Sequence, residues 1–298
     1  MLYYRRKILL ALMQCFNGQL TAIELQKYLF LFTRNQETKV YDFVPYQYGC
    51  FSFQANQDIA TLEKYGYIAK DDNNRIMLVK TEDYMMMLDM FDQQYLRQLK
   101  NDFGDYSQTD IIRYTYQHYP YYATKSVIAN SVLADCPEYL EKIENQKRHF
   151  ADPQLFTIGY EGISLETYIN RLIINDVRVL CDVRKNAYSQ KYGFSKTQLA
   201  TACKGVGILY VHVPQLGIDS DKRQDLRSQR DYDLLFDEYE RTTLKDNHEA
   251  LLYVRSLIDT HKRVALTCFE KDPRQCHRSR VAKALMGLKD KDYTLKTL

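Results

Sequence analysis

The sequence has no tryptophan, no C-x-x-C pair and no long uninterrupted apolar run. A membrane-spanning helix needs about 18 or more consecutive apolar residues, and no stretch of this chain approaches that length. The N-terminus does not have the pattern of a signal peptide, because three cations precede only a short apolar run that Gln14 interrupts. We therefore expect a cytoplasmic protein that does not contact a membrane.

The seven cysteines form an odd-numbered set, and most of them lie inside apolar runs. This pattern is not typical of a disulfide framework or of a zinc finger. We expect no metal site, and no motif indicates a cofactor.

Repeats, low-complexity tracts and a Gly/Ser-rich linker are also absent. Apolar residues make up 45% and charged residues 27% of the chain, as in average soluble proteins. The 298 residues exceed the ~100–200 residues of an ordinary domain, so two domains are expected. Helical spacing of apolar residues gives way, near Asp152-Pro153, to β-branched runs alternating with helices. We place the domains at 1–150 and 151–298.

Tyrosine is abundant instead of tryptophan, with 26 residues. Tyrosine suits polar interfaces and base stacking, and it is also common in cores. The net charge is +3, and the basic excess lies in residues 151–298, which hold 24 Lys and Arg against 20 Asp and Glu. This excess is mild, so nucleic-acid binding must be argued from local clusters.

The N-terminal half has the element order of a winged-helix-like, mainly helical domain. Helices are predicted over 5–16, 21–33 and 55–65, and a hairpin over 68–79 with its turn at Asn73-Asn74. Such a unit binds DNA or serves as a small interaction domain. Its candidate helices carry few cations apart from Lys27, Arg34 and Lys64, whereas duplex binders neutralise several phosphates. Both interpretations stay open.

Two segments of this half carry a resemblance, namely 25–31 (LQKYLFL) and 43–53 (FVPYQYGCFSF). They are similar to the N-terminal module that precedes some bacterial DUF488 domains and, more distantly, to Panacea-type antitoxin domains. The likeness covers about residues 5–80.

The C-terminal half is expected to be an α/β domain with a Rossmann-like parallel sheet. Four apolar strands separated by helices are predicted over 155–159, 178–183, 208–213 and 263–269. Open α/β sheets bind ligands outside the carboxyl ends of their strands. The loops that follow the strands therefore hold the candidate site residues, which are Tyr160, Glu161, Asp182, Arg184, Ser189, Glu270, Cys276, His277, Arg278 and Arg280.

The loop after the strand 263–269 predicts a site for a bound anion. Cys276 and His277 open a helix whose free backbone N–H groups favour negative charge, and Arg278 and Arg280 add donors suited to phosphate. The alternative is a charged first turn with Cys276 merely buried.

Three carboxylates, those of Glu161, Asp182 and Glu270, follow three strands and are expected to face one crevice with arginines among them. Such a group can divide into a charged stabiliser and a proton-carrying acid or base. The alternative is ion pairing that only fixes the loops.

This half closely resembles the DUF488 family over about residues 155–285. The matching pieces are Thr157-Ile158-Gly159-Tyr160-Glu161-Gly162, Asp182-Val183-Arg184 with Ser189, Gly193-Phe194-Ser195, Tyr210-Val211-His212-Val213-Pro214 with Leu216-Gly217, and Cys268-x-Glu270 followed by Cys276-His277-Arg278. One departure is Asn186-Ala187-Tyr188, where members usually carry a proline before the serine. The resemblance implies an α/β fold and a polar site formed by these motifs, and it leaves the reaction open.

The preferred hypothesis is an enzyme that cleaves an N-glycosidic bond in DNA, including modified DNA, or in a nucleotide. Asp182 would stabilise charge on the sugar, with Glu270 or Glu161 as acid or base. Arg184, Ser189, Cys276, His277, Arg278 and Arg280 would bind the substrate, and Tyr160 would stack on an extruded base. The alternatives are a phosphoesterase or nuclease, and a DNA-binding or nucleotide-sensing regulator without catalysis.

Overall fold

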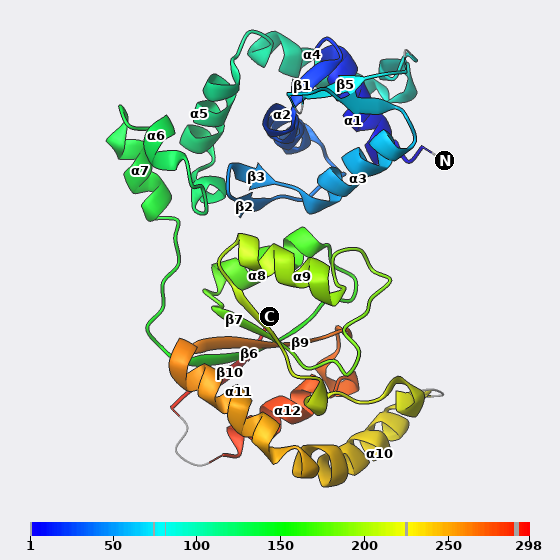
Figure 1. Cartoon of the computed structure of the whole chain (residues 1–298), viewed down its shortest axis with the longest axis vertical. Coiled ribbons are helices and arrows are strands. Elements are labelled where there is room, and N and C mark those ends of the chain that lie inside the picture. The colour runs from blue at the N-terminus through cyan, green and yellow to red at the C-terminus, as the bar shows by residue number, and fades with distance from the viewer. Residues whose placement is uncertain (1, 74, 81, 224–225, 289–291) are drawn as a thin grey trace. The chain divides into compact units, whose positions relative to one another are not determined.

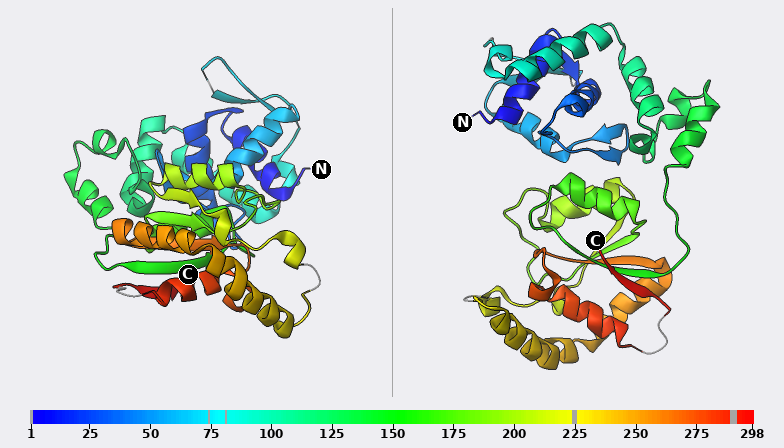
Figure 2. Two further views of the ribbon diagram at one scale, coloured as in Figure 1. Left: turned by 60° about the horizontal axis from the view of Figure 1, so that its bottom comes forward. Right: turned by 180° about the vertical axis from the view of Figure 1, so that it is seen from behind.

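The computed structural model describes residues 2–73, 75–80, 82–223, 226–288 and 292–298. The chain divides into two compact units, Met1–Lys147 and Arg148–Leu298. Figures 1 and 2 show the elements of each unit from several sides. No helix in the described ranges combines the length and the hydropathy that crossing a bilayer requires.

The N-terminal unit begins with three helices and two small antiparallel sheets. The helices are α1 (Tyr4–Cys15), α2 (Ala22–Asn35) and α3 (Phe53–Lys64). One sheet has the order β1-β5-β4, and its strands are β1 (Gln19–Thr21), β4 (Ile68–Lys70) and β5 (Arg75–Leu78). The other is the hairpin of β2 (Val44–Tyr46) and β3 (Gly49–Phe51). The three predicted helices and the 68–79 hairpin are confirmed, whereas β1 and the β2–β3 pair were not predicted as strands.

A capping box begins α2: the side chains of Thr21 and Glu24 accept hydrogen bonds from each other's backbone N–H groups at 3.2 and 2.8 Å. The turn predicted at Asn73-Asn74 lies partly outside the described residues. The rest of this unit is helical, in the elements η1 (Met85–Met87), α4 (Met90–Phe103), α5 (Gln108–His118), η2 (Pro120–Ala123), α6 (Ala129–Val132) and α7 (Pro137–Glu144).

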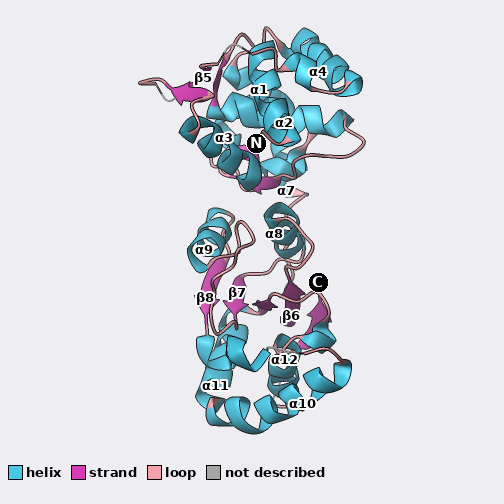
Figure 3. Cartoon of the chain, turned by 90° about the vertical axis from the view of Figure 1, so that its right-hand side faces the viewer, coloured by secondary structure: helices cyan, strands magenta, loops and turns pink. Residues whose placement is uncertain are grey.

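The C-terminal unit is a five-stranded parallel sheet with helices on both faces, as the Rossmann-like prediction requires. The strand order is β10-β6-β9-β7-β8. The strands are β6 (Gln154–Gly159), β7 (Val179–Asp182), β8 (Leu209–His212), β9 (Arg263–Cys268) and β10 (Thr294–Thr297). The helices α8 (Leu165–Ile174) and α9 (Lys196–Gly205) cover one face, and α11 (His248–His261) and α12 (Arg278–Met286) cover the other (Figures 1 and 3).

The long connection between β8 and β9 holds further helical elements. These are η3 (Pro214–Leu216), η4 (Ser220–Arg223), α10 (Gln229–Tyr239) and a π-helical stretch, η5 (Glu240–Leu244), that runs on from α10. A last short turn, η6 (Pro273–Gln275), precedes α12.

The fifth strand, β10, was not predicted. All four of its residues are exposed. It pairs only with β6, and its sequence lacks the apolar run that identified the other four strands.

The chain reverses direction across the sheet between β6 and β9. From β6 it passes through α8 to β7, whereas from β9 it passes through α12, on the opposite face, to β10 at the other edge. The neighbours β6 and β9 are paired in parallel, with Gly159 opposite Cys268 at their carboxyl ends. Such a point, where the connections of two adjacent strands diverge, is where open α/β sheets bind ligands.

Candidate functional site

The loops after β6 and β9 are joined by backbone hydrogen bonds. The N–H groups of Tyr160 and Glu161 donate to the carbonyl oxygen of Phe269 at 3.1 and 3.0 Å. In return, the Glu161 carboxylate accepts a hydrogen bond from the N–H of Lys271 at 2.9 Å. Glu161 and Lys271 are both exposed. The divergence point of the sheet therefore presents an exposed carboxylate fixed by a backbone N–H group.

Gly159 allows this close approach. A Cβ atom at this position would lie 2.0 Å from the carbonyl oxygen of Glu270 and 2.8 Å from its carbonyl carbon. Backbone atoms cannot rotate away as a side chain can, so only glycine lets the two loops meet.

We expect Gly159→Ala to lower the free energy of unfolding of the C-terminal unit by about 1–3 kcal/mol, because the ends of β6 and β9 must separate to admit a methyl group. Urea unfolding followed by circular dichroism measures this change. Gly287→Ala is the matched control, since its Cβ would lie 3.3 Å from the nearest atom. A Gly159→Ala chain as stable as this control would contradict the close packing.

Asp182, at the end of β7, is fully buried and bound on several sides. The Nε of Arg184 donates to both of its carboxylate oxygens at 2.9 and 3.1 Å. The hydroxyl of Tyr210, from β8, donates to the same carboxylate at 2.6 Å. Burial raises the pKa of Tyr210, and the charge on Asp182 raises it further, so the phenol stays protonated as a donor.

Arg184 is 5% exposed and continues this network toward β6. Its Nη1 donates to the hydroxyl of Tyr160 at 2.6 Å and to the carbonyl of Phe194 at 2.9 Å. Burial alone would lower the pKa of Arg184, but its hydrogen bonds and charge interactions with Asp182 and Tyr160 together outweigh burial, and the pKa is raised. The hydrogen bonds of the pair are therefore satisfied within the protein.

The Tyr160 ring is covered by protein. It stacks on Phe194 with the ring centres 4.2 Å apart and the planes 9° from parallel, and only 2% of the residue is exposed. Burial is also the main cause of its raised pKa. Phe269, directly after β9, is 42% exposed and packs edge-on against Tyr160. Tyr188, in the loop after β7, is a second exposed aromatic residue, at 71%.

Ser189 lies in the loop that follows β7. Its Oγ accepts from the N–H of Lys191 at 3.2 Å, and its own N–H donates to Ser195 at 3.3 Å. The Lys191 ammonium in turn donates to the carbonyl of Tyr160 at 2.7 Å, and burial lowers its pKa while the charge on Glu161 opposes that shift. Ser189 thus shapes a loop that brings a lysine beside Glu161.

The residues Cys276, His277 and Arg278 are buried together at the start of α12, with at most 1% of each exposed. The Nε2 of His277 lies 2.9 Å from the carbonyl oxygen of Val183, which joins this turn to the β7 loop. Arg278 donates to the carbonyl oxygens of Glu270 and Lys271. The predicted phosphate donors therefore bind the protein's own backbone.

Arg280 lies apart from this group. It pairs with Glu240 at 3.1 Å and approaches Asp233 to 3.9 Å. It also lines a separate cavity of about 490 Å³ together with Arg274 and Lys283. Arg280 lies two residues beyond Arg278 in the first turn of α12 and faces Asp233 of α10. The other predicted site residues lie at the carboxyl edge of the sheet.

Four residues of the site were not assigned a role from the sequence, namely Lys191, Phe194, Tyr210 and Phe269. The position of Phe269, directly after an apolar strand, is a signal that an aromatic residue lies at the carboxyl edge. The roles of the other three depend on contacts between distant segments, which the sequence does not show.

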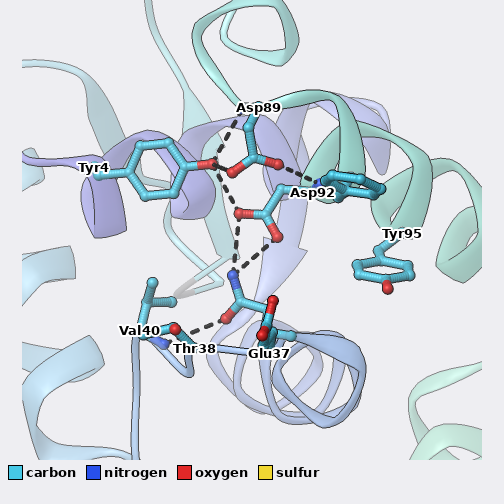
Figure 4. Close-up of a pocket in the computed structure, with 9 residues that line it drawn as sticks. Tyr4, Glu37, Thr38, Val40, Asp89, Asp92 and Tyr95 are labelled. Carbon is cyan, nitrogen blue, oxygen red and sulfur yellow. Dashed lines mark hydrogen bonds between the residues drawn. The ribbon is translucent and has the colours of Figure 1, made fainter.

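The N-terminal unit has a cavity of about 430 Å³ whose lining is acidic. Figure 4 shows the Tyr4 hydroxyl between the carboxylates of Asp89 and Asp92, with Glu37 at the same cavity. These charges repel phosphate, so the cavity does not suit a nucleic acid.

The cations of the predicted DNA-binding helices are mostly withdrawn from solvent. Lys27 is 1% exposed, and its ammonium donates to backbone carbonyls, including that of Tyr48. Arg34 lies over the Phe30 ring, 4.3 Å from its centre. Of the three, Lys64 is the exposed one.

Comparison with known proteins identifies part of the chain. Residues 164–285 match a family described as "Domain of unknown function DUF488". No curated protein and no solved structure matches the chain, and no family model covers the N-terminal module. The predicted resemblance is thus confirmed for residues 164–285, and the C-terminal unit contains a DUF488 domain.

Proposed function

We propose that the C-terminal unit hydrolyses an N-glycosidic bond in a nucleic acid or a nucleotide bound over the carboxyl ends of β6 and β9. The observation that carries the proposal is the position of Glu161, an exposed carboxylate fixed by a backbone N–H at the divergence point of the sheet. Cleavage of an N-glycosidic bond builds positive charge on the sugar, and a nearby carboxylate stabilises that charge.

Glu161 takes the role of general base in this proposal. Its carboxylate accepts a proton from the attacking water, the hydroxide adds to the sugar carbon, and the base leaves with the bonding electrons and a proton from solvent. Glu161 is preferred to Asp182 because Asp182 is buried and already bound by Arg184 and Tyr210.

Asp182 and Arg184 act as positioning residues. Their ion pair holds the β7 loop against Tyr160 and Phe194, and this loop carries Lys191 to the side of Glu161. The cations available to a phosphate are then Lys191 and the exposed Lys271 rather than the buried arginines.

Phe269 replaces Tyr160 as the proposed stacking surface for a base. We expect Phe269→Ala to weaken binding of a nucleotide or single-stranded oligonucleotide about 5- to 150-fold, because base stacking contributes about 1–3 kcal/mol. Fluorescence anisotropy of a labelled oligonucleotide measures the change. Phe150→Ala is the matched control, since Phe150 has a similar exposure of 41%. Equal binding by the two variants would remove Phe269 from the site.

One observation favours a second candidate, a nucleotide sensor without catalysis. The hydrogen bonds of Asp182 and Arg184 are completed within the protein, as in a pair that only fixes loops. In that case ligand binds at the same edge and is released unchanged.

Product analysis separates the candidates. The full chain is incubated with normal and modified DNA and with nucleotides, and free base, abasic sites and strand breaks are scored. The proposal predicts free base and abasic sites without strand breaks. Strand breaks that depend on added Mg²⁺ would instead indicate a phosphoesterase, and tight binding without any product would indicate a sensor.

A further inference from the structure

Three buried side chains of the types that bind metals lie together beside the proposed reactive edge. The sulfur atoms of Cys268 and Cys276 and a ring nitrogen of His277 all lie within 4.8 Å of one another. Cys268 ends β9, and the other two residues precede α12. At most 1% of each residue is exposed. The fold thus gathers them from two sides of the loop 269–275.

The His277 ring is oriented as a ligand. Its Nε2 lies 2.9 Å from the carbonyl oxygen of Val183, which can only accept a hydrogen bond, so Nε2 carries the proton. The other ring nitrogen, Nδ1, faces the sulfur of Cys268 at 3.7 Å. Metal-binding histidines are commonly held in this way, by a hydrogen bond from the nitrogen that does not bind the metal.

Glu270 lies beside this three-residue group without belonging to it, and is the candidate for a fourth donor. One of its carboxylate oxygens lies 3.3 Å from the sulfur of Cys268. In a tetrahedral zinc site, bonds of about 2.3 Å to sulfur and about 2.0–2.1 Å to nitrogen or oxygen separate neighbouring ligand atoms by about 3.5–3.8 Å. The two separations from the Cys268 sulfur, 3.3 and 3.7 Å, are close to that geometry, and the ligand atoms of Cys268, Cys276 and His277 lie at most 4.8 Å apart.

Arg278 provides an independent reason for negative charge here. Its guanidinium is fully buried, its Nε has no acceptor, and its donors reach only the carbonyl oxygens of Glu270 and Lys271. Among the residues that the structure describes, no carboxylate oxygen forms an ion pair with it, and Asp272, which is paired with Arg274, interacts with it only at longer range. A buried charge without a close counter-charge is costly. A Zn²⁺ ion with two thiolates and one carboxylate carries a net charge of −1, which compensates it.

We propose that Cys268, Cys276, His277 and Glu270 bind one Zn²⁺ ion. The two thiols lose their protons to solvent as the thiolates bind, and no oxidation is involved. The ion links the end of β9 to the start of α12 and so fixes the loop 269–275. This loop contacts the β6 loop through the backbone of Phe269, which accepts from Tyr160 and Glu161, and through Lys271, which donates to Glu161. This metal site is separate from the proposed reaction, because Glu161 is not one of its ligands.

The test uses the full chain, reduced and stripped of metal with a chelator, and titrated with Co²⁺ and then Zn²⁺. We expect one equivalent of Co²⁺ to bind with the visible absorption of tetrahedral cobalt and a thiolate-to-cobalt charge-transfer band. Zn²⁺ should displace it and raise the melting temperature of the chain. Absence of binding at one equivalent, or binding without the charge-transfer band, would overturn the proposal.

Variants assign the ligands. Cys276→Ser and His277→Gln should each weaken Zn²⁺ binding roughly 100-fold or more. Cys203→Ser, which changes an equally buried cysteine in α9, should bind as the unsubstituted chain does. Glu270 is only half-buried, so Glu270→Gln is expected to fold; it should retain the charge-transfer band and shift the visible bands. Equal affinity of Cys276→Ser and Cys203→Ser, or an unchanged spectrum of Glu270→Gln, would contradict the ligand set.

Discussion

Replacement of Asp182 by alanine is expected to lower the free energy of unfolding of the C-terminal unit by about 3–5 kcal/mol. The substitution leaves the Arg184 guanidinium buried at 5% exposure without its counter-charge. It also removes the acceptor of the Tyr210 hydroxyl, which lies 2.6 Å from the carboxylate. A loss of this size is a large fraction of the stability of an ordinary domain.

Hydrogen exchange on the full chain, read at the amides of β7 and β9, measures this loss in the unit concerned. Tyr210→Phe removes one hydrogen bond and should cost about 1 kcal/mol. Asp259→Ala is the control. Asp259 is 51% exposed and forms a surface ion pair with Arg255, so its loss should cost less than about 1 kcal/mol.

The comparison of Asp182→Ala with Asp259→Ala also decides how Asp182 acts. A large loss of stability means that loss of activity in Asp182→Ala reflects a displaced β7 loop. If the two substitutions cost the same, Asp182 is not an element of the buried network, and a direct role in the reaction becomes the better explanation.

Glu161→Gln is expected to lower the rate of base release about 10²- to 10⁴-fold while binding of the oligonucleotide changes little. Glutamine keeps an oxygen that accepts the 2.9 Å hydrogen bond from Lys271, so the loops stay joined. It cannot accept a proton from water. The expected loss is therefore in the rate at saturating substrate rather than in affinity.

The measurement is single-turnover release of free base by chromatography, with affinity from anisotropy. Glu238→Gln, a substitution of the same type at a carboxylate that is 56% exposed on α10, should leave both quantities unchanged. A Glu161→Gln chain that releases base at the unsubstituted rate would exclude Glu161 as the general base.

The strands β6, β7, β8 and β9, and the edge of the sheet at which they end, could be predicted because these strands carry apolar runs. Gly159, Asp182 and Glu270 lie at that edge as expected, since parallel strands end on the same side of a sheet. The strand β10 was missed because all four of its residues are exposed and form no such run.

Side-chain environments were predicted less well, because they depend on contacts between distant segments. Asp182 and Tyr160 lie at the ends of strands, where reactive residues are expected, yet both are buried. Asp182 is bound by Arg184 and Tyr210, and Tyr160 is stacked on Phe194. Arg280 is two residues beyond Arg278, and this step along a helix turns it toward Glu240 instead of the edge.

The cysteine cluster illustrates the same limit. No C-x-x-C pair precedes it, and seven residues separate Cys268 from Cys276. The loop 269–275 folds back so that the two sulfur atoms and His277 meet. Sequence spacing therefore predicted no metal site, and the proposed one depends on tertiary structure.

The most direct test of the central claim is where a ligand binds. Hydrogen exchange is measured on the full Glu161→Gln chain with and without a single-stranded oligonucleotide, so that binding is observed without turnover. Binding over the divergence point of the sheet predicts slower exchange in residues 160–163 and 269–272. Slower exchange confined to α2 and α3, with these two loops unchanged, would contradict it.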